Sequence, residues 1–120
     1  MASATTTLWR PVGPRELELI VATGNRRFPP RLPDQPIFYP VCNERYAIEI
    51  ADRWNTAASG VGYVTRFDVN SDFIAAYETH VVGARHHEEY WIPAEELEAF
   101  NDAIVRTIEV VRTYSAKTPT

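Results

Sequence analysis

His86-His87-Glu88-Glu89-Tyr90-Trp91-Ile92-Pro93 places two histidines and an acidic pair directly before an apolar, aromatic segment. We expect this segment to be a strand with Glu89, His87 and Trp91 on one face, because successive side chains of a strand point to opposite faces. A carboxylate beside large rings is poorly solvated, an arrangement that is typical of functional sites. The stretch is therefore the first candidate for chemistry in this chain.

The composition predicts one small folded domain. The chain has 120 residues, of which 45% are hydrophobic, and its aromatic side chains are three Trp, six Tyr and five Phe. These values are typical of a single globular domain. The 16 acidic and 12 basic side chains give a net charge of −4, which repels a phosphate backbone and disfavours nucleic acid as a partner.

Cysteine usage and the N-terminal segment bear on the compartment. Cys42 is the only cysteine, which excludes an intrachain disulfide and a cysteine-rich zinc site. Residues 1–7 lack the basic and apolar regions of a secretory signal, and no apolar run approaches the roughly 20 residues of a membrane-spanning helix. We expect a cytoplasmic protein with no membrane partner.

The spacing of apolar, proline and glycine residues predicts an α+β domain over 8–114, with loose ends at 1–7 and 115–120. Five prolines between Pro29 and Pro40 exclude a regular helix there and favour a stiff, extended loop. Besides the acidic segment, we expect strands at 8–12, 37–39, 63–69, 79–82 and 107–114. We expect helices at 15–23, 43–54, 71–77 and 94–101.

Two helix starts carry recognisable capping residues. Asn43 is expected to cap the best-formed helix, and Ser71 is expected to cap a short helical turn. The apolar face of the first of these helices is predicted to consist of Ala47, Ile50, Ala51 and Trp54.

Three separate segments resemble the core motifs of the ADP-ribosyltransferase fold, in its poly(ADP-ribose) polymerase and diphtheria-toxin branch. Leu8-Trp9-Arg10, followed by a helix and then Pro29-Pro30, is similar to the Leu-Trp-His-Gly strand of the first motif. Ile37-Phe38-Tyr39 and the helix behind it resemble the Gly-Ile-Tyr-Phe strand and helix of the second. Glu89-Tyr90-Trp91-Ile92 resembles the Glu-Tyr-Ile-Val strand of the third. With Pro93 in register, it also resembles the Glu-x-Glu-Val-Leu-Ile-Pro strand of the arginine-specific transferases.

The resemblance implies two small, mostly antiparallel sheets with flanking short helices around an NAD cleft. NAD would be the substrate, and the bond between nicotinamide and ribose would break through an oxocarbenium-like transition state. Glu89 would then hold a ribose hydroxyl near the developing charge, Tyr39 would lie under the nicotinamide ring, and Arg10 would fix the ribose or the diphosphate. Further candidates for binding NAD are Tyr46, His87 and Trp91.

The chain departs from the polymerase branch at Pro11. That branch has a Gly here, whose backbone N–H and C=O hold the nicotinamide amide, whereas proline has no N–H. Either the amide is held elsewhere, or the protein binds a different ligand or none. The departure leaves open whether the protein is catalytically active.

Three classes of function therefore stay open. The first is a small bacterial, toxin-like or modifying enzyme, an NAD-dependent ADP-ribosyltransferase or NAD glycohydrolase with an unknown protein or small-molecule acceptor. The second is an inactive module that binds NAD or ADP-ribose, and the third is a protein-interaction domain that uses the loop 29–40. A nucleic-acid-directed transferase is supported only by the small basic cluster Arg26, Arg27 and Arg31.

Each candidate residue also has a purely structural interpretation. Tyr39 and Trp91 can be core aromatics, because an aromatic in a short strand more often packs than contacts a ligand. Glu89 can be a solvated or salt-bridged strand residue near Arg85, and Arg10 can pair with a surface carboxylate.

The histidine pair raises the question of a metal site, and the cysteine raises the question of a reactive thiol. If His86 and His87 lie on a strand they point to opposite faces, so only one could join Glu89 around a metal ion, with His80 or distant acids as further ligands. We therefore expect no metal site. Cys42 is expected to be a buried structural thiol.

Overall fold

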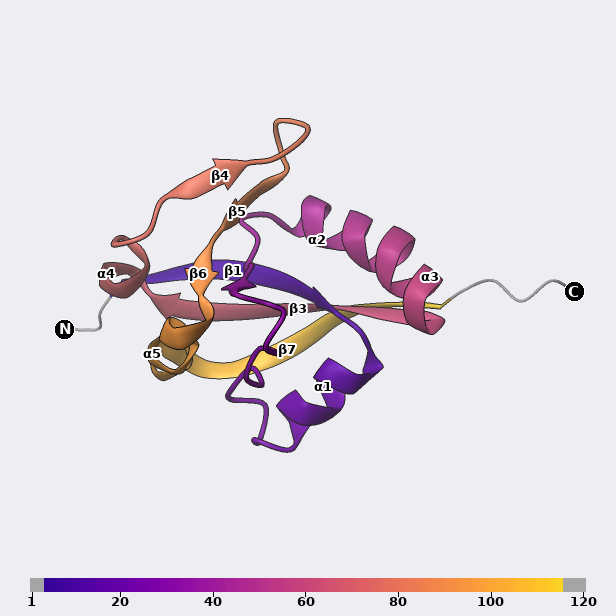
Figure 1. The fold of residues 1–120 in the computed structure, drawn as a ribbon, viewed down its shortest axis with the longest axis horizontal. Coiled ribbons are helices and arrows are strands. Elements are labelled where there is room, and N and C mark those ends of the chain that lie inside the picture. Colours follow the sequence, from indigo (N-terminus) through magenta and orange to yellow (C-terminus); the bar gives the residue numbers. More distant parts are fainter. Residues whose placement is uncertain (1–3, 116–120) are drawn as a thin grey trace, which may run out of the picture.

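A three-stranded antiparallel sheet runs through the middle of the protein (Figure 1). The computed structural model describes residues 4–115. Its strand order is β1 (Thr5–Val12), β3 (Val61–Asn70) and β7 (Ile104–Ser115), with β3 in the centre. The predicted α+β class and the antiparallel pairing are confirmed.

The ends of the domain differ from the prediction. Thr5–Thr7 were expected to be loose, but they belong to β1 and pair with Asp68–Asn70 of β3. Ser115 likewise is the last residue of β7. Residues 1–3, and residues 116–120 of the predicted tail, lie outside the described residues.

A second antiparallel pair continues the sheet beyond β1. It consists of β4 (Thr79–Val81) and β5 (Glu88–Tyr90), and Val41 bridges it to β1. The Val41 N–H donates to the Trp9 carbonyl oxygen at 2.8 Å, and the Trp9 N–H donates to the Val41 carbonyl oxygen at 3.0 Å. Val41 therefore acts as a one-residue strand beside β1.

The same segment is also bonded to β5 on its other side. The Cys42 N–H donates to the Glu88 carbonyl oxygen at 3.0 Å, and the Tyr90 N–H donates to the Pro40 carbonyl oxygen at 2.9 Å. These bonds hold the chain that follows β2 between β1 and β5, so that three segments distant in sequence lie next to one another.

A third, very short antiparallel pair lies where the Pro-rich loop ends. β2 (Ile37–Phe38) pairs with β6 (Ile92–Pro93), and β6 leads into η2 (Ala94–Glu96) and α5 (Leu97–Asp102). The predicted helix at 94–101 is thus present, with a 3₁₀ first turn. Tyr39 lies just past the end of β2 rather than within the strand.

The core forms on both faces of β3, as the predicted alternation requires. On one face Phe67 packs with Phe28 and Phe100, at ring-centroid distances of 4.9 and 6.0 Å. On the other face Val64 packs with Ala47 and Ala51 of the helical segment. The sheet is therefore buried on both sides at its centre.

Two short helices begin close to where the sequence predicts. α1 (Pro14–Val21) begins with Pro14 in its first turn, where a missing N–H costs nothing. α4 (Ser71–Ile74) is capped by Asn70, whose side-chain oxygen accepts from the Asp72 N–H at 2.9 Å. The expectation that Ser71 is the cap was wrong by one residue, because Ser71 is already helical.

The longest helical segment is continuous but not uniform. α2 (Glu44–Ile50) runs into a π-helical turn, η1 (Ala51–Asn55), and then into α3 (Thr56–Ser59). Asn43 caps α2 as predicted, because its side-chain oxygen accepts from the Tyr46 N–H at 2.8 Å.

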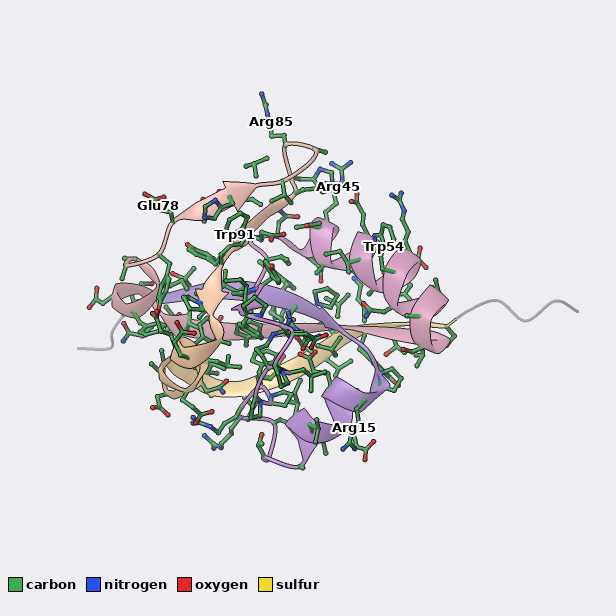
Figure 2. The ribbon with its side chains drawn as sticks, viewed as in Figure 1. Arg15, Arg45, Trp54, Glu78, Arg85 and Trp91 are labelled. Atoms are coloured by element: carbon green, nitrogen blue, oxygen red, sulfur yellow. The ribbon has the colours of Figure 1, made fainter. Side chains whose placement is uncertain are left out.

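The π-helical turn corrects one part of the predicted apolar face. Ala47 and Ala51 are buried, but Trp54 is 70% exposed. A π-turn holds more residues than an α-turn, so the residues within it rotate away from the positions that a 3.6-residue period assigns. Trp54 consequently lies on the side of the segment turned away from the sheet (Figure 2).

Among residues 4–115 no helix combines the length and the apolar character that crossing a bilayer requires.

Gly62 marks the closest approach of the helical segment to β3. A Cβ at this position would overlap the Ala51 carbonyl oxygen and lie 2.7 Å from the Asn55 Cβ. We expect Gly62→Ala to lower the free energy of unfolding by about 1–3 kcal/mol, because one of the two elements must shift. Urea denaturation would measure the change.

Gly13→Ala is the matched control. A Cβ at Gly13 would meet the Ser59 hydroxyl oxygen at 3.5 Å and the Asn55 side-chain nitrogen at 4.0 Å, both ordinary contacts. Equal stability of the Gly62 and Gly13 variants would contradict the close packing described above.

Candidate active site

Arg10, Tyr39 and Glu89 line one cavity of about 310 Å³. Arg10 lies in the second half of β1, Tyr39 follows β2, and Glu89 is the middle residue of β5. They meet because Val41 pairs with both Trp9 and Glu89. The remaining lining residues are Pro11, Arg31, Val41 and Ile50.

Glu89 is a buried carboxylate that neutral donors hold in place. Its side chain accepts from the Tyr46 hydroxyl at 2.8 Å and from the Trp91 indole N–H at 2.9 Å, one donor to each oxygen. The residue is 7% exposed. The proposed pairing with Arg85 is not found, since Arg85 lies at the tip of the β4–β5 loop and points away from the body (Figure 2). Among residues 4–115 no cationic side chain forms an ion pair with Glu89, and its hydrogen-bond donors are both neutral groups.

Aromatic stacking fixes the two donors of Glu89. The Tyr46 ring stacks on His87 at 4.6 Å, and the Trp91 ring stacks on His80 at 3.8 Å. Burial, followed by the hydrogen bond to Glu89, raises the pKa of Tyr46 well above its usual range. The phenol therefore remains a hydrogen-bond donor to Glu89 at any physiological pH.

Three of the residues that we predicted to bind NAD lie outside the cavity lining in the structure. Tyr46, His87 and Trp91 are absent from the residues that line the cavity. Tyr46 and Trp91 contact Glu89 directly, and His87 acts through Tyr46. Trp91 is not a core aromatic, since it is 41% exposed, whereas Tyr46 is partly buried and packs against the core cluster that contains Ala47 and Val64.

Both histidines bind one carboxylate, and it is Glu49 rather than Glu89. His86 Nε2 lies 2.8 Å from one Glu49 carboxylate oxygen, and His87 Nε2 lies 2.7 Å from the other. The prediction that the two rings point to opposite faces was wrong, because both precede β5 and lie in the turn after β4. The helix spacing could have revealed Glu49, since it lies three residues after Tyr46 and on the same helix face.

The ligand atoms of Glu49, His86 and His87 lie within 4.8 Å of one another, close enough to raise the question of a metal ion. His87 Nδ1 accepts from the Ala84 N–H at 3.1 Å, so the hydrogen-bond network assigns the ring proton to Nε2, where it is donated to Glu49. In that tautomer Nε2 has no lone pair for a metal. A metal-binding histidine instead donates its other N–H to an acceptor, and Ala84 offers a donor. The arrangement fits a hydrogen-bonded support better than a metal centre.

Arg10 has a carboxylate partner, as its structural interpretation supposed. Its guanidinium contacts Glu16 through two hydrogen bonds, of 2.6 and 3.1 Å, and donates to the Tyr39 carbonyl oxygen at 3.3 Å. It also lies 4.5 Å from the centroid of the Phe38 ring. Arg10 therefore ties α1 to the chain that carries Tyr39, and most of its fork of donors is already used.

Tyr39 is not part of the core. Its side chain is 39% exposed and borders the cavity, while the preceding Phe38 is buried. The carbonyl oxygen of Tyr39 is held by Arg10, and the next residue, Pro40, accepts from the Tyr90 N–H. The backbone is thus fixed on both sides of a ring that is free to contact a ligand.

The predicted basic cluster is dispersed. Arg27 pairs with Asp102 and Glu98, which raise its pKa and attach the loop to α5. Arg31 instead lines the cavity, a position that nothing in its sequence context indicated. Arg26 and Arg27 border a separate hollow together with Arg106, so Arg31 does not join them in one cationic face.

Cys42 offers no nucleophile at this site. Burial, with a smaller contribution from the nearby Glu88 and Glu89, raises the pKa of the thiol to about 12. A thiol with that pKa is protonated at neutral pH. This agrees with a structural role, but Cys42 is only partly buried rather than buried as predicted.

Comparisons with protein-family models, with curated proteins and with solved structures find no match for this chain. The chemistry of the cavity is therefore the basis for assigning a function.

The Tyr46 hydroxyl is expected to matter for stability. Tyr46→Phe would leave one oxygen of the buried Glu89 without its donor, which commonly costs about 1–3 kcal/mol. Tyr63→Phe is a suitable control, because the Tyr63 hydroxyl makes no hydrogen bond to any residue of the described part. Equal free energies of unfolding for the two variants would contradict the role given to Tyr46.

Glu49 should contribute to stability in a pH-dependent way. Hydrogen bonds from His87 and then His86 lower its pKa from 4.5 to about 2. As the pH falls through this interval the unfolded chain binds a proton at Glu49 and the folded chain does not, so stabilisation present above pH 4.5 is lost towards pH 2. We expect the stability difference between wild type and Glu49→Gln, measured by denaturant titration, to shrink over this range.

Glu18→Gln provides the comparison for that titration. Glu18 pairs with Arg15 on the surface, where both side chains are more than 70% exposed, and such pairs contribute little. A Glu49→Gln difference that stays constant from pH 6 to pH 2 would show that the histidine contacts do not favour the charged carboxylate.

Proposed function

We propose that this protein binds NAD and cleaves its nicotinamide–ribose bond, as an NAD glycohydrolase or an ADP-ribosyltransferase. The supporting observation is that Arg10, Tyr39 and Glu89, the residues that carry the resemblance to the ADP-ribosyltransferase fold, border one cavity. They come from three segments that only tertiary structure brings together. The proposed fold assignment to that superfamily rests on the same convergence and on the antiparallel sheets around it.

Glu89 has the chemistry that this reaction needs. Cleavage transfers the electrons of the C–N bond to nicotinamide and leaves positive charge on the ribose. Each oxygen of Glu89 accepts one hydrogen bond and keeps a further lone pair, which can accept a ribose hydroxyl. A fixed negative charge in a largely dry wall stabilises the developing cation more strongly than it could in water.

The cation must then be captured by a nucleophile. Water attacking the ribose carbon yields ADP-ribose, nicotinamide and a proton, whereas a nucleophilic group on an acceptor yields the ADP-ribosylated acceptor. In both cases Glu89 acts through its charge and is not consumed.

Tyr39 and Arg10 have supporting roles in this proposal. The half-exposed Tyr39 ring offers the flat surface on which nicotinamide can stack. Arg10 holds the Tyr39 backbone and is neutralised by Glu16, so it positions the ring rather than gripping phosphate. This differs from the role that the resemblance assigned to Arg10.

Binding without turnover is the second candidate, and Pro11 favours it. Pro11 lines the cavity and has no N–H with which to hold the nicotinamide amide. A protein that keeps the carboxylate and the ring but lacks this donor can retain ADP-ribose without orienting nicotinamide for departure. The loop 29–40 has less to offer as a protein-binding surface, because Phe38 is buried and Tyr39 faces the cavity.

Release of nicotinamide from NAD tests the proposal. We expect Glu89→Gln to lower the rate by about 10²–10³, since loss of one preorganised electrostatic group has that effect. Glu88→Gln is the matched control: its side chain bonds to Thr79 at 2.6 Å and does not line the cavity. Turnover by Glu88→Gln should equal that of wild type.

Two results would reject the enzymatic role. If wild type releases no nicotinamide yet melts at a higher temperature with ADP-ribose, the binding module is the better description. If Glu89→Gln turns NAD over as fast as Glu88→Gln does, Glu89 has no part in the reaction.

A further inference from the structure

A second hollow lies beside the first. It has a volume of about 360 Å³ and is bordered by the Pro-rich loop and by α1. The residues that line it are Arg15, Glu16, Leu19, Pro29, Pro30, Arg31, Leu32 and Gln35. Leu32 is 61% exposed there, which gives the hollow an apolar side chain that a flat ligand could cover.

Arg31 borders both hollows. The Arg10–Glu16 pair lies at the same boundary, since Arg10 lines the first hollow and Glu16 the second. The wall between the two spaces is therefore built from charged groups, and Arg31 is the residue that faces both sides.

The Arg31 guanidinium makes one hydrogen bond within the described residues. Its Nε donates to the Ile37 carbonyl oxygen at 3.1 Å, which fixes the base of the guanidinium. Among residues 4–115 its two terminal amino groups have no hydrogen-bond partner, and no carboxylate forms an ion pair with it. Arg10, by contrast, has both oxygens of Glu16.

Among residues 4–115 no carboxylate pairs directly with Arg31, although Glu16 lies near enough to act on its charge. Burial lowers the pKa of Arg31 and the charge of Arg10 lowers it further, while the charges of Glu16 and Tyr39 offset this only in part. Partly buried charges are normally paired, and the nearest candidate, Glu16, is occupied by Arg10. An anionic ligand would supply the missing partner.

We propose that Arg31 binds the diphosphate of a ligand whose two ribose-containing halves occupy the two hollows. One half would lie against Tyr39 and Glu89, and the other against Leu32 and Pro30. A guanidinium with both terminal amino groups free can contact two phosphate oxygens at once. That the ligand is NAD or ADP-ribose rests on the proposed function, whereas the need for an anion at Arg31 does not.

The dimensions agree with a two-part ligand. Sites for small molecules commonly have volumes of about 300–1,000 Å³. Each hollow alone is at the lower end of this range, so a single hollow suits a mononucleoside and the pair suits a dinucleotide. Recognition at the junction selects ligands with phosphate between the two halves.

Calorimetric titration with ADP-ribose, ADP and adenosine tests this inference. We expect wild type to bind ADP-ribose more tightly than adenosine. We expect Arg31→Gln to weaken ADP-ribose binding about ten- to hundredfold, because hydrogen bonds between charged groups are lost. Adenosine, which has no phosphate, should bind both proteins equally. ADP keeps both phosphates, so Arg31→Gln should weaken its binding by a similar factor.

Arg26→Gln is the matched control, because it removes the same charge from an exposed position of the same loop region. It should bind ADP-ribose as wild type does. Arg31→Lys keeps the charge but not the fork, so it should give an intermediate affinity if it folds as wild type does. With wild type alone, raising the salt concentration should weaken ADP-ribose binding and leave adenosine binding unchanged.

The outcomes separate this inference from the proposed function. Arg31-dependent binding of ADP-ribose without nicotinamide release supports the inference and rejects the enzyme. Nicotinamide release by Arg31→Gln with unchanged affinity for ADP-ribose supports the enzyme and overturns the inference. Failure of wild type to bind ADP-ribose more tightly than adenosine also overturns it.

Discussion

The arrangement of the site depends on the double pairing of Val41. One residue exchanges two backbone hydrogen bonds with Trp9 of β1, and its neighbours on either side bond to β5. Val41 itself is 1% exposed, so these bonds are shielded from water. The pairing fixes how each segment is aligned along its neighbour. Arg10, Tyr39 and Glu89 therefore reach the same cavity. A shift of one residue at Val41 would turn side chains to the opposite face.

The charged side chains around the cavity fall into two kinds, those paired with an opposite charge and those that are not. Arg10 is matched by Glu16 and therefore serves as a structural bond between α1 and the loop. Glu89 is held by neutral donors and Arg31 by a backbone carbonyl, so among the described residues neither has an ion-pair partner. The cavity thus presents one negative and one positive group that the protein itself does not neutralise. Such groups are costly to bury unless a ligand completes them, and this is the physical basis for regarding the cavity as a binding site.

Much of the local structure follows directly from short-range rules. Pro14 starts α1, Asn43 caps α2, and alternation along β3 separates its two buried faces. These short-range rules failed at two places where the chain leaves a regular helix or strand. The π-helical turn exposes Trp54, and the turn before β5 lets both His86 and His87 reach Glu49. Neither a π-turn nor a turn of this kind has a periodic pattern that a sequence would reveal.

The sequence by itself determined the α+β class, most helix and strand positions, and the three residues that meet at the cavity. These depend on local propensity and on motif order, both of which are written along the chain. Tertiary structure alone decided the partners: Glu16 for Arg10, Tyr46 and Trp91 for Glu89, and no carboxylate for Arg31. The reason is that a partner is chosen by distance in space. The hydrogen bonds at Val41 set those distances between segments that are about 30 to 80 residues apart along the chain.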